Sequence, residues 1–326
     1  MKLSQVGEKK LIEVARKVFR KGPKVRIGIG DDAAVIDLDG AGLVATTDML
    51  VSSTHFPPGA TPEDMARKAV VTNLSDLAAM GAEPLGLLFS VALPRKLDMA
   101  FVRRMMLEMD SVAKEYGTYV VGGDLDESDE IIIAGVALGR VKKWKPLTRA
   151  GAEAGDLVAV TGNIGSASAG LRILMDKLPQ KRFKALTDAQ LRPAARVREG
   201  LALGKSGVVT SAVDITDGLA ANLWQLAKES GVMIEIERES LPEDPLVSCL
   251  CYERGFRPDD FVLYGGEDFE LLFTVRPGGW RKVLNALKRL GTKATVIGKV
   301  SRGKGVFVFE NWRKRRLPDR GYEHFR

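Results

Sequence analysis

Residues 61–82 read TPEDMARKAVVTNLSDLAAMGA, and this stretch decides the fold of the first half of the chain. Thr61 is a typical helix N-cap, and Pro62 suits the first turn. Asp64 follows the cap by three residues, as in a capping box, and Gly81 is a typical residue for the end of a helix. The stretch therefore predicts a helix from Thr61 to Gly81.

Two polar residues interrupt the apolar second half of this helix. Asn73 and Asp76 are three residues apart, so they lie on one face. A carboxylate among apolar neighbours is costly unless it is paired or bound to an ion. We therefore favour Asp76 as a metal ligand. The alternative is that Asp76 accepts hydrogen bonds from the backbone amides of a neighbouring loop.

Short β-rich runs surround this helix in the first half, and a second α/β pattern follows. Residues 142–146, KKWKP, are charged and contain a proline, so we place a domain boundary there, between residues 1–145 and residues 146–326. The sequence predicts a mixed α/β protein of two domains. Expected strands are 33–38, 43–47, 85–93, 119–121, 131–141, 158–161, 208–215, 232–236, 271–275, 295–300 and 306–309, and expected helices are 9–17, 61–81, 99–116, 167–177, 219–230 and 281–290.

Composition limits the class of protein. The chain has 326 residues, 45% of them hydrophobic, and a formal net charge of +7. Its basic residues are dispersed except for the run at 313–316, which we interpret as a solvated surface segment, so no nucleic-acid partner is expected. No run approaches the roughly 20 apolar residues of a membrane helix. Cys249 and Cys251 are expected to be reduced thiols in a cytoplasmic protein without a membrane partner.

Acidic side chains gather in six short clusters where predicted strands meet loops or helices. Gathered carboxylates repel one another, so a site that keeps several of them ionised has to hold cations. Oxygen ligands on loops favour magnesium, which in turn suggests a phosphate substrate. The clusters are GDD at 30–32, TTD at 46–48, NLSD at 73–76, GGD at 122–124, DITDG at 214–218 and GGED at 265–268.

Three of these clusters are expected to meet Asp76 or a bound phosphate. Asp32 begins a predicted strand and Asp48 closes one, so both can converge with Asp76. Asp124 ends another strand behind Gly123, where a ligand can approach the backbone. Taken singly, each Gly-Asp pair is equally typical of a turn.

Further candidates lie in the second half. Asp217 is a possible N-cap of the helix at 219–230, while Asp214 and Thr216 face a ligand; the alternative is that all three only start the helix. The glycine-rich turn at 162–166 either binds phosphate or simply closes the turn. Arg149, at the domain junction, has the forked geometry that suits phosphate oxygens. A P-loop, a protein-kinase signature and a Rossmann fingerprint are absent from the sequence.

Together these segments resemble the thiamine-monophosphate kinase family. Its superfamily also holds aminoimidazole ribonucleotide synthetase, selenophosphate synthetase and the hydrogenase maturation factor that dehydrates a carbamoyl group. The similarity covers nearly the whole chain, from residue 28 to residue 325. It is most specific at Thr47-Asp48, at His55-Phe56, at residues 71–82 and at 265–271, GGEDFEL.

The resemblance implies a role for each matching residue. No residue is implied as a covalent or acid–base catalyst. Implied ligands of several magnesium ions are Asp32, Thr46, Thr47, Asp48, Asp76, Asp124, Asp214 and Asp217; implied ATP contacts are Gly123, Asp124, Arg149 and Thr216; implied contacts to thiamine monophosphate are His55, Glu267 and Tyr322.

The resemblance also implies an assembly and a reaction. The amino-terminal sheets of two subunits would close a barrel in a homodimer, with ATP near the interface. The reaction would be direct in-line transfer of the ATP γ-phosphoryl group to thiamine monophosphate, the last step of thiamine diphosphate biosynthesis. The alternatives are another ATP-using synthetase of the superfamily, similar to aminoimidazole ribonucleotide synthetase, and a basic nucleic-acid-binding protein. The lack of an early cysteine disfavours selenophosphate synthetase.

Overall fold

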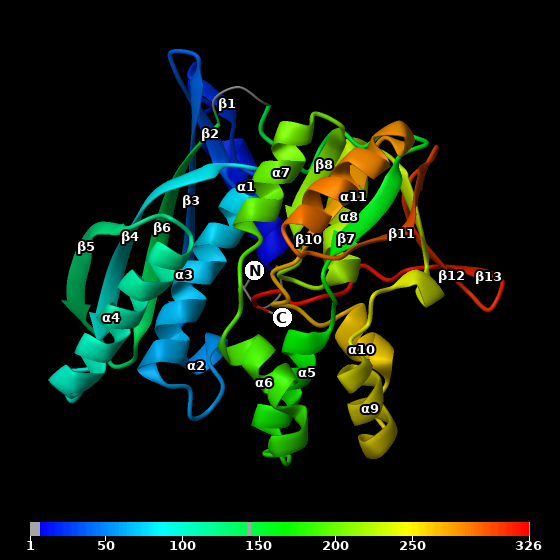
Figure 1. The fold of residues 1–326 in the computed structure, drawn as a ribbon. Coiled ribbons are helices and arrows are strands. Elements are labelled where there is room, and N and C mark those ends of the chain that lie inside the picture. Colours follow the sequence, from blue (N-terminus) through cyan, green and yellow to red (C-terminus); the bar gives the residue numbers. More distant parts are fainter. Residues whose placement is uncertain (1–6, 142–144, 326) are drawn as a thin grey trace.

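The computed structural model describes residues 7–141 and 145–325 and contains two mixed β-sheets with helices packed against them (Figure 1). The predicted mixed α/β class is confirmed. The boundary predicted at residues 142–146 falls largely on 142–144, which lie outside the described residues. The division into two domains at that point therefore stays a prediction.

The first sheet has six strands in the order β1-β2-β3-β6-β4-β5. Its one parallel pair, among the strands described, is β4 with β5. Helices α3 (Pro62–Ala79) and α4 (Met99–Glu115) pack together on one face of this sheet. The strands are β1 (Val25–Ile27), β2 (Ala34–Leu38), β3 (Ala41–Val51), β4 (Glu83–Leu93), β5 (Val120–Glu127) and β6 (Ile132–Val141), and the short helix α2 (Ser52–His55) follows β3.

The second sheet has seven strands in the order β13-β12-β9-β11-β7-β10-β8. The strands are β7 (Leu157–Thr161), β8 (Val209–Asp214), β9 (Met233–Glu237), β10 (Leu271–Val275), β11 (Ala294–Ser301), β12 (Gly305–Glu310) and β13 (Arg313–Arg316). The helices around it are α5 (Ser166–Met175), α6 (Lys184–Leu191), α7 (Val197–Ser206), α8 (Leu219–Ser230), α9 (Pro245–Arg254), α10 (Pro258–Val262) and α11 (Trp280–Arg289).

Helix α3 begins as its sequence predicts and occupies the centre of the molecule. Thr61 and Asp64 form the reciprocal capping box, with the Asp64 amide 3.2 Å from the Thr61 hydroxyl and the Thr61 amide 3.0 Å from the Asp64 carboxylate. The helix contacts β3 and β6 of the first sheet as well as α7 and β8 of the second half. Leu74 and Leu77 accordingly share one hydrophobic cluster with Leu203 and Phe273. A helix buried on several sides needs apolar residues around most of its circumference, which explains its composition.

Most predicted elements are present, with two corrections that affect the site. Strand β3 extends to Val51 and β5 extends to Glu127. Asp48 and Asp124 therefore lie inside strands, not at their ends as predicted. Long pairing of β3 with β6 and of β5 with β4 carries both strands past the polar residues at which the sequence pattern predicted an end.

Several short elements escaped prediction, although α9 has a local start signal in Asp244 and Pro245. The basic run at 313–316 forms the exposed edge strand β13, paired with β12. Cys249 and Cys251 are free thiols, as expected. Among the described helices, none combines the length and apolar character that crossing a membrane requires.

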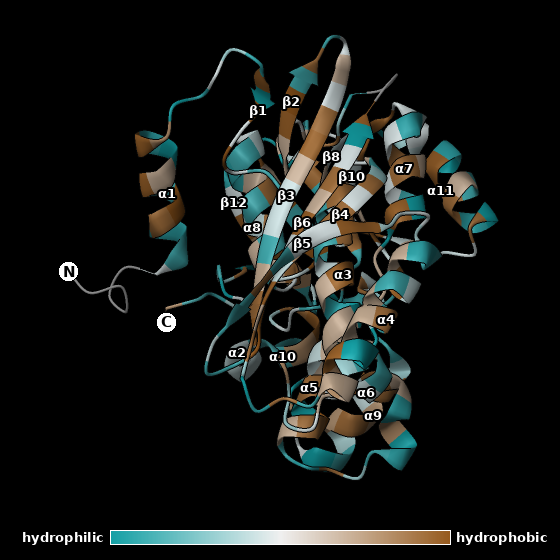
Figure 2. Cartoon of the chain, turned by 90° about the vertical axis from the view of Figure 1, so that its left-hand side faces the viewer, coloured by the Kyte–Doolittle hydropathy of each residue, from teal (hydrophilic) through white to brown (hydrophobic). Residues whose placement is uncertain are grey.

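Helix α1 (Glu8–Val18) lies beside the main body, joined to it by an extended segment (Figure 2).

Candidate functional site

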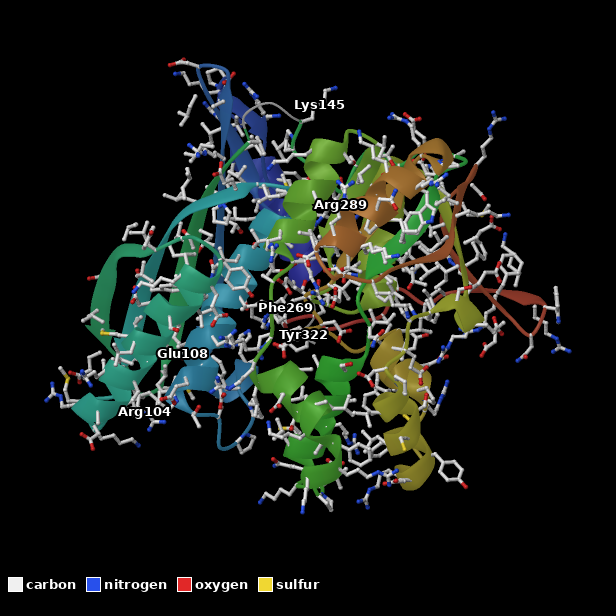
Figure 3. All side chains as sticks on the ribbon, in the orientation of Figure 1. Arg104, Glu108, Lys145, Phe269, Arg289 and Tyr322 are labelled. Atoms are coloured by element: carbon white, nitrogen blue, oxygen red, sulfur yellow. The ribbon has the colours of Figure 1, made fainter. Side chains whose placement is uncertain are left out.

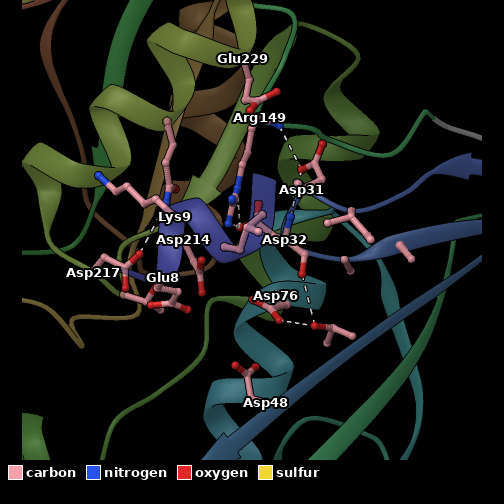
Figure 4. A pocket seen from close by; sticks show the side chains of 18 of the residues that line it. Glu8, Lys9, Asp31, Asp32, Asp48, Asp76, Arg149, Asp214, Asp217 and Glu229 are labelled. Atoms are coloured by element: carbon pink, nitrogen blue, oxygen red, sulfur yellow. Dashed lines mark hydrogen bonds and ion pairs between the residues drawn. The ribbon is translucent and has the colours of Figure 1, made fainter. Parts of the chain in front are cut away.

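Carboxylates from three distant parts of the chain meet in one cavity of about 830 Å³. Asp32 comes from the segment before β2, Asp76 from α3 and Asp214 from the end of β8, and one oxygen of each lies within 4.8 Å of the others. Asp48 on β3 lines the same cavity. Figure 4 shows these side chains converging from the strand, the helix and the loops. The predicted convergence of Asp32, Asp48 and Asp76 is confirmed.

Hydrogen bonds hold these carboxylates in place. Two guanidinium nitrogens of Arg149 donate to Asp32 Oδ1 at 2.6 and 3.1 Å. The Thr46 hydroxyl donates to Asp76, and the Ser75 hydroxyl donates to Asp214 Oδ2 at 2.5 Å. In residues 7–141 and 145–325, Asp76 accepts from the Thr46 hydroxyl group and from no loop amide, which argues against the alternative interpretation of this residue.

The cluster contains more carboxyl groups than the guanidinium of Arg149 can neutralise if all are ionised. Burial is the main cause that raises the pKa of Asp76 well above its usual value, and repulsion from Asp48, Asp214 and Asp32 raises it further. Burial, followed by the charge of Asp32, raises the pKa of Asp214 to about 8. Within the described part of the chain, Asp32 Oδ2 and Asp48 Oδ2 are buried and have no hydrogen-bond partner. Unpartnered buried carboxylate oxygens in such a group fit a bound divalent cation.

The segment DITDG at 214–218 contributes to the same cavity, but not as predicted at its helix. Helix α8 starts at Leu219, and its N-cap is Gly218 with a φ of 108°. Asp217 therefore does not cap the helix, because the chain turns through Gly218 before the helix begins. Its carboxylate lines the cavity together with Thr216, and burial raises the pKa of Asp217 to about 6. The side chain of Asp217 is thus available to a ligand.

A second cavity of about 650 Å³ adjoins the first and brings together the three residues expected at the acceptor. His55, Glu267 and Tyr322 line it, although they come from α2, from the segment before β10 and from the carboxy-terminal tail. Figure 3 shows Phe269 and Tyr322 at the centre of the molecule. Burial lowers the pKa of His55, which favours the neutral form of its imidazole. Residues that line both cavities are Asp48, Thr216, Asp217 and Tyr322.

The segment 265–270, part of which lines the second cavity, has an unusual backbone. Glu267 and Phe269 have φ values of 68° and 52°, a region that residues other than glycine seldom adopt. Backbone bonds from Glu267 N to Thr216 O at 2.8 Å and from Phe269 N to Ile215 O at 3.0 Å hold it. Between them, Asp268 accepts from the amides of Gly165 at 2.7 Å and Ala167 at 3.2 Å.

This carboxylate decides between the two interpretations of the glycine-rich turn at 162–166. Asp268 occupies the amides at the start of α5 that a phosphate would need. We therefore favour the structural interpretation of this turn. Its amides bind the carboxylate of Asp268, which caps the amino-terminal end of α5.

Gly123 and Asp124 are not brought into this arrangement within one chain. Both are exposed on β5, the last strand of the first sheet, and neither lines either cavity. Thr46 and Thr47 do line the first cavity, where the Thr47 hydroxyl donates to Gly135 O at 2.8 Å.

Comparison with known proteins assigns the family. AIR synthase related protein, N-terminal domain, matches residues 30–141, and AIR synthase related protein, C-terminal domain, matches residues 153–311. The thiamine-monophosphate kinase of Aquifex aeolicus is 35% identical over 327 residues and covers 100% of each chain. That of Pyrococcus horikoshii is 36% identical over 300 residues, 91% of each chain. The chain belongs to the thiamine-monophosphate kinase family.

Solved structures agree with membership of the thiamine-monophosphate kinase family. The structure of AaThiL complexed with AMPPCP and TMP has a TM-score of 0.89 at 33% identity, and the match covers 99% of both chains. Thiamine monophosphate kinase from Aquifex aeolicus has a TM-score of 0.82 at 32% identity, over 94% of this chain and 98% of that one. The hydrogenase maturation protein HypE of E. coli, with a TM-score of 0.72 at 24% identity, shares the fold.

Sequence reasoning missed several residues that shape the two cavities of this thiamine-monophosphate kinase family member. Lys68 and Gln190 contact Glu267, and no local pattern marks either residue. Helix α1 supplies Lys9 and Arg16 to the first cavity. Lys9 Nζ lies 2.7 Å from Oδ1 of Asp319 in the carboxy-terminal tail. Contacts between residues about 300 positions apart leave no signal in sequence spacing.

Proposed function

We propose that the chain transfers the γ-phosphoryl group of ATP directly to thiamine monophosphate, giving thiamine diphosphate and ADP. The observation that carries this proposal is that two adjoining cavities share Asp48, Thr216, Asp217 and Tyr322. A phosphoryl donor bound in the first cavity and a phosphoryl acceptor bound in the second would meet at Asp48 and Asp217. Such an arrangement suits in-line transfer, which depends on alignment and on neutralisation of charge. The enzyme is expected in the cytoplasm.

The first cavity is proposed to hold the nucleotide and magnesium. Arg149 and Thr216 contact ATP. Two hydrogen bonds from the guanidinium of Arg149 to Asp32 orient the arginine. The carboxylates hold the ions, which supply charge neutralisation to the phosphates when bound. The full set of proposed ligands in one chain is Asp32, Thr46, Thr47, Asp48, Asp76, Asp214 and Asp217.

The second cavity is proposed to hold thiamine monophosphate, contacted by His55, Glu267 and Tyr322. Apolar side chains such as Phe56 and Met65 contribute to its lining, as the rings of the acceptor require. The carboxylate of Glu267 provides an acceptor for hydrogen bonds and a charge opposite to that of the thiazolium ring.

Replacing Glu267 by Gln is expected to raise the KM for thiamine monophosphate by about tenfold or more, because hydrogen bonds to charged groups contribute about 1.5–3 kcal/mol. The KM for ATP should change much less, since the loop of Glu267 lies on the acceptor side. Steady-state kinetics with each substrate varied in turn gives both constants. An unchanged KM for thiamine monophosphate would reject the role of Glu267.

The function is tested with purified protein, ATP, magnesium and three acceptors: thiamine monophosphate, thiamine and an aminoimidazole precursor. Products are identified by mass spectrometry. Thiamine diphosphate formed only from thiamine monophosphate supports the proposal. Conversion of the aminoimidazole precursor in its place would support a synthetase of the same superfamily.

A homodimer is proposed to complete the nucleotide site. Strand β5 forms an edge of the first sheet, and Val121 and Leu125 on it are 61% and 63% exposed, as is Tyr119 just before it at 60%. An exposed apolar edge strand is a ready site for pairing with another chain. A second copy of this chain, placed there to close a barrel, would bring Gly123 and Asp124 to the interface with ATP.

Replacing Val121 by Glu is expected to shift the protein from dimer to monomer, because a charge in an apolar interface loses its hydration. Light scattering coupled to gel filtration measures the mass. Leu107→Glu on α4, where Leu107 is 54% exposed, is the matched control and should remain dimeric. A dimeric Val121→Glu protein, or a monomeric wild type, would refute the proposed interface.

A further inference from the structure

A buried lysine lies behind the proposed acceptor site. Lys68 on α3 has a side chain that is only 3% exposed. Its ammonium nitrogen lies 2.6 Å from Glu267 Oε1 and 2.7 Å from Glu267 Oε2. The same nitrogen donates to the backbone carbonyl of His55 at 2.7 Å. One ammonium group therefore joins the two segments that carry His55 and Glu267, two of the proposed acceptor contacts.

The carboxylate of Glu267 receives a second donor from a third element. Gln190 on α6 donates its amide nitrogen to Glu267 Oε2 at 2.5 Å. Gln190 Oε1 is buried and has no hydrogen-bond partner among the described residues, because the amide nitrogen faces the carboxylate. Because Lys68 and Gln190 both donate hydrogen bonds to its oxygens, the Glu267 carboxylate has one defined orientation toward the cavity that it lines.

Stability alone does not explain this ion pair. An ion pair with a buried member is often no more stabilising than apolar residues of the same volume, because the buried charge, here that of Lys68, loses hydration. Glu267 also has a left-handed backbone, with a φ of 68°. Surrounding contacts are needed to maintain such a conformation, and it is typical of functional segments.

The position of Lys68 on α3 also connects the two cavities. Asp76 follows Lys68 by eight residues on the same helix, a rise of about 12 Å. An α-helix packed on several sides is a rigid spacer. The contact between Lys68 and Glu267 therefore fixes the position of the Glu267 carboxylate relative to the carboxylates in the first cavity.

We propose that Lys68 is a positioning residue for the acceptor: it does not line the cavity, and it acts by holding Glu267 and the His55 segment at a defined place relative to Asp76. The inference rests on the proposed function, because it requires Glu267 to contact thiamine monophosphate. It adds a residue whose effect is confined to the acceptor side of the reaction.

The test is Lys68→Met, which keeps the length of the side chain and removes its charge. The KM for thiamine monophosphate is expected to rise roughly 10- to 100-fold, the effect of losing a charged hydrogen bond, while the KM for ATP stays within about twofold. Lys68→Arg, which keeps the charge, is expected to recover part of the loss. Calorimetric titration with thiamine monophosphate and a non-hydrolysable ATP analogue measures acceptor binding without turnover.

Lys114→Met is the matched control, because Lys114 makes an ion pair of the same length, 2.6 Å, with Asp110 on the exposed surface of α4. Its kinetic constants should equal those of the wild type. The double variant Lys68→Met/Glu267→Gln avoids an unpaired buried charge, so it provides a folded protein even where Lys68→Met is unstable. Its KM for thiamine monophosphate should match that of Glu267→Gln alone, since Lys68 acts through Glu267.

The inference would be overturned by an unchanged affinity of Lys68→Met for thiamine monophosphate, or by independent and multiplying losses in the double variant. A loss of thermal stability with proportional losses for both substrates would also overturn it, since a purely structural residue behaves in that way. If the wild-type protein neither binds nor phosphorylates thiamine monophosphate, the proposed function itself fails. The two failures are therefore distinguishable.

Discussion

Replacing Asp76 by Asn is expected to lower kcat by about two to three orders of magnitude at saturating magnesium. The substitution keeps the shape of the side chain and an oxygen that can accept from the Thr46 hydroxyl. It removes one carboxylate from the group that includes Asp32 and Asp214. Loss of a comparable preorganised electrostatic group costs about 3–4 kcal/mol in the transition state.

The same substitution should leave the fold intact. Burial and neighbouring carboxylates raise the pKa of Asp76, so the folded protein disfavours its charge and a neutral amide relieves repulsion. The melting temperature is therefore expected to stay level or to rise. Asp110→Asn, on the exposed surface of α4, is the control for kcat. Near-normal turnover of Asp76→Asn at saturating magnesium would contradict the proposed metal site.

Replacing Arg149 by Met is expected to weaken both nucleotide binding and folding. The guanidinium forks onto Asp32, whose side chain is 0% exposed. Removing one member of a buried pair leaves an uncompensated charge and costs about 3–5 kcal/mol. The free energy of unfolding from chemical denaturation and the dissociation constant of an ATP analogue measure the two effects.

Arg140→Met is the matched control for Arg149. Arg140 forks onto Glu83 at 2.8 and 3.2 Å, but the two side chains are 36% and 44% exposed. An exposed pair contributes only about 0–1 kcal/mol. The double variant Asp32→Asn/Arg149→Met should recover stability without recovering nucleotide affinity. A change in stability for Arg149→Met no larger than that of the control would show that the pair is not an essential part of the site.

Local sequence signals were sufficient where the decisive interactions are local. The capping box of Thr61 and Asp64 lies within four residues, and it predicted the start of α3 correctly. Helix α8 shows the limit of such signals. Asp217 has the residue type of an N-cap, yet Gly218 takes that position, because backbone conformation at the turn decides where the helix begins.

The site was predictable to the extent that residue type reveals it. Asp32, Asp48 and Asp76 were expected to converge because several carboxylates in a basic protein need a shared cation. Lys68 was not predicted, because its partner Glu267 is 199 residues away and a lysine in a helix is ordinarily solvated. The predicted place of Asp124 beside ATP is not met within one chain, since its strand β5 is an exposed edge.

By itself, the sequence determined the mixed α/β class, most elements, the family resemblance and the expectation that Asp32, Asp48 and Asp76 converge. These properties depend on neighbouring residues and on side-chain type. The tertiary structure alone decided that two cavities share Asp48, Thr216, Asp217 and Tyr322, and that Lys68 lies behind Glu267. Packing of α3 against both halves of the molecule sets these relations, and no local pattern encodes the distance between residues that meet only after folding.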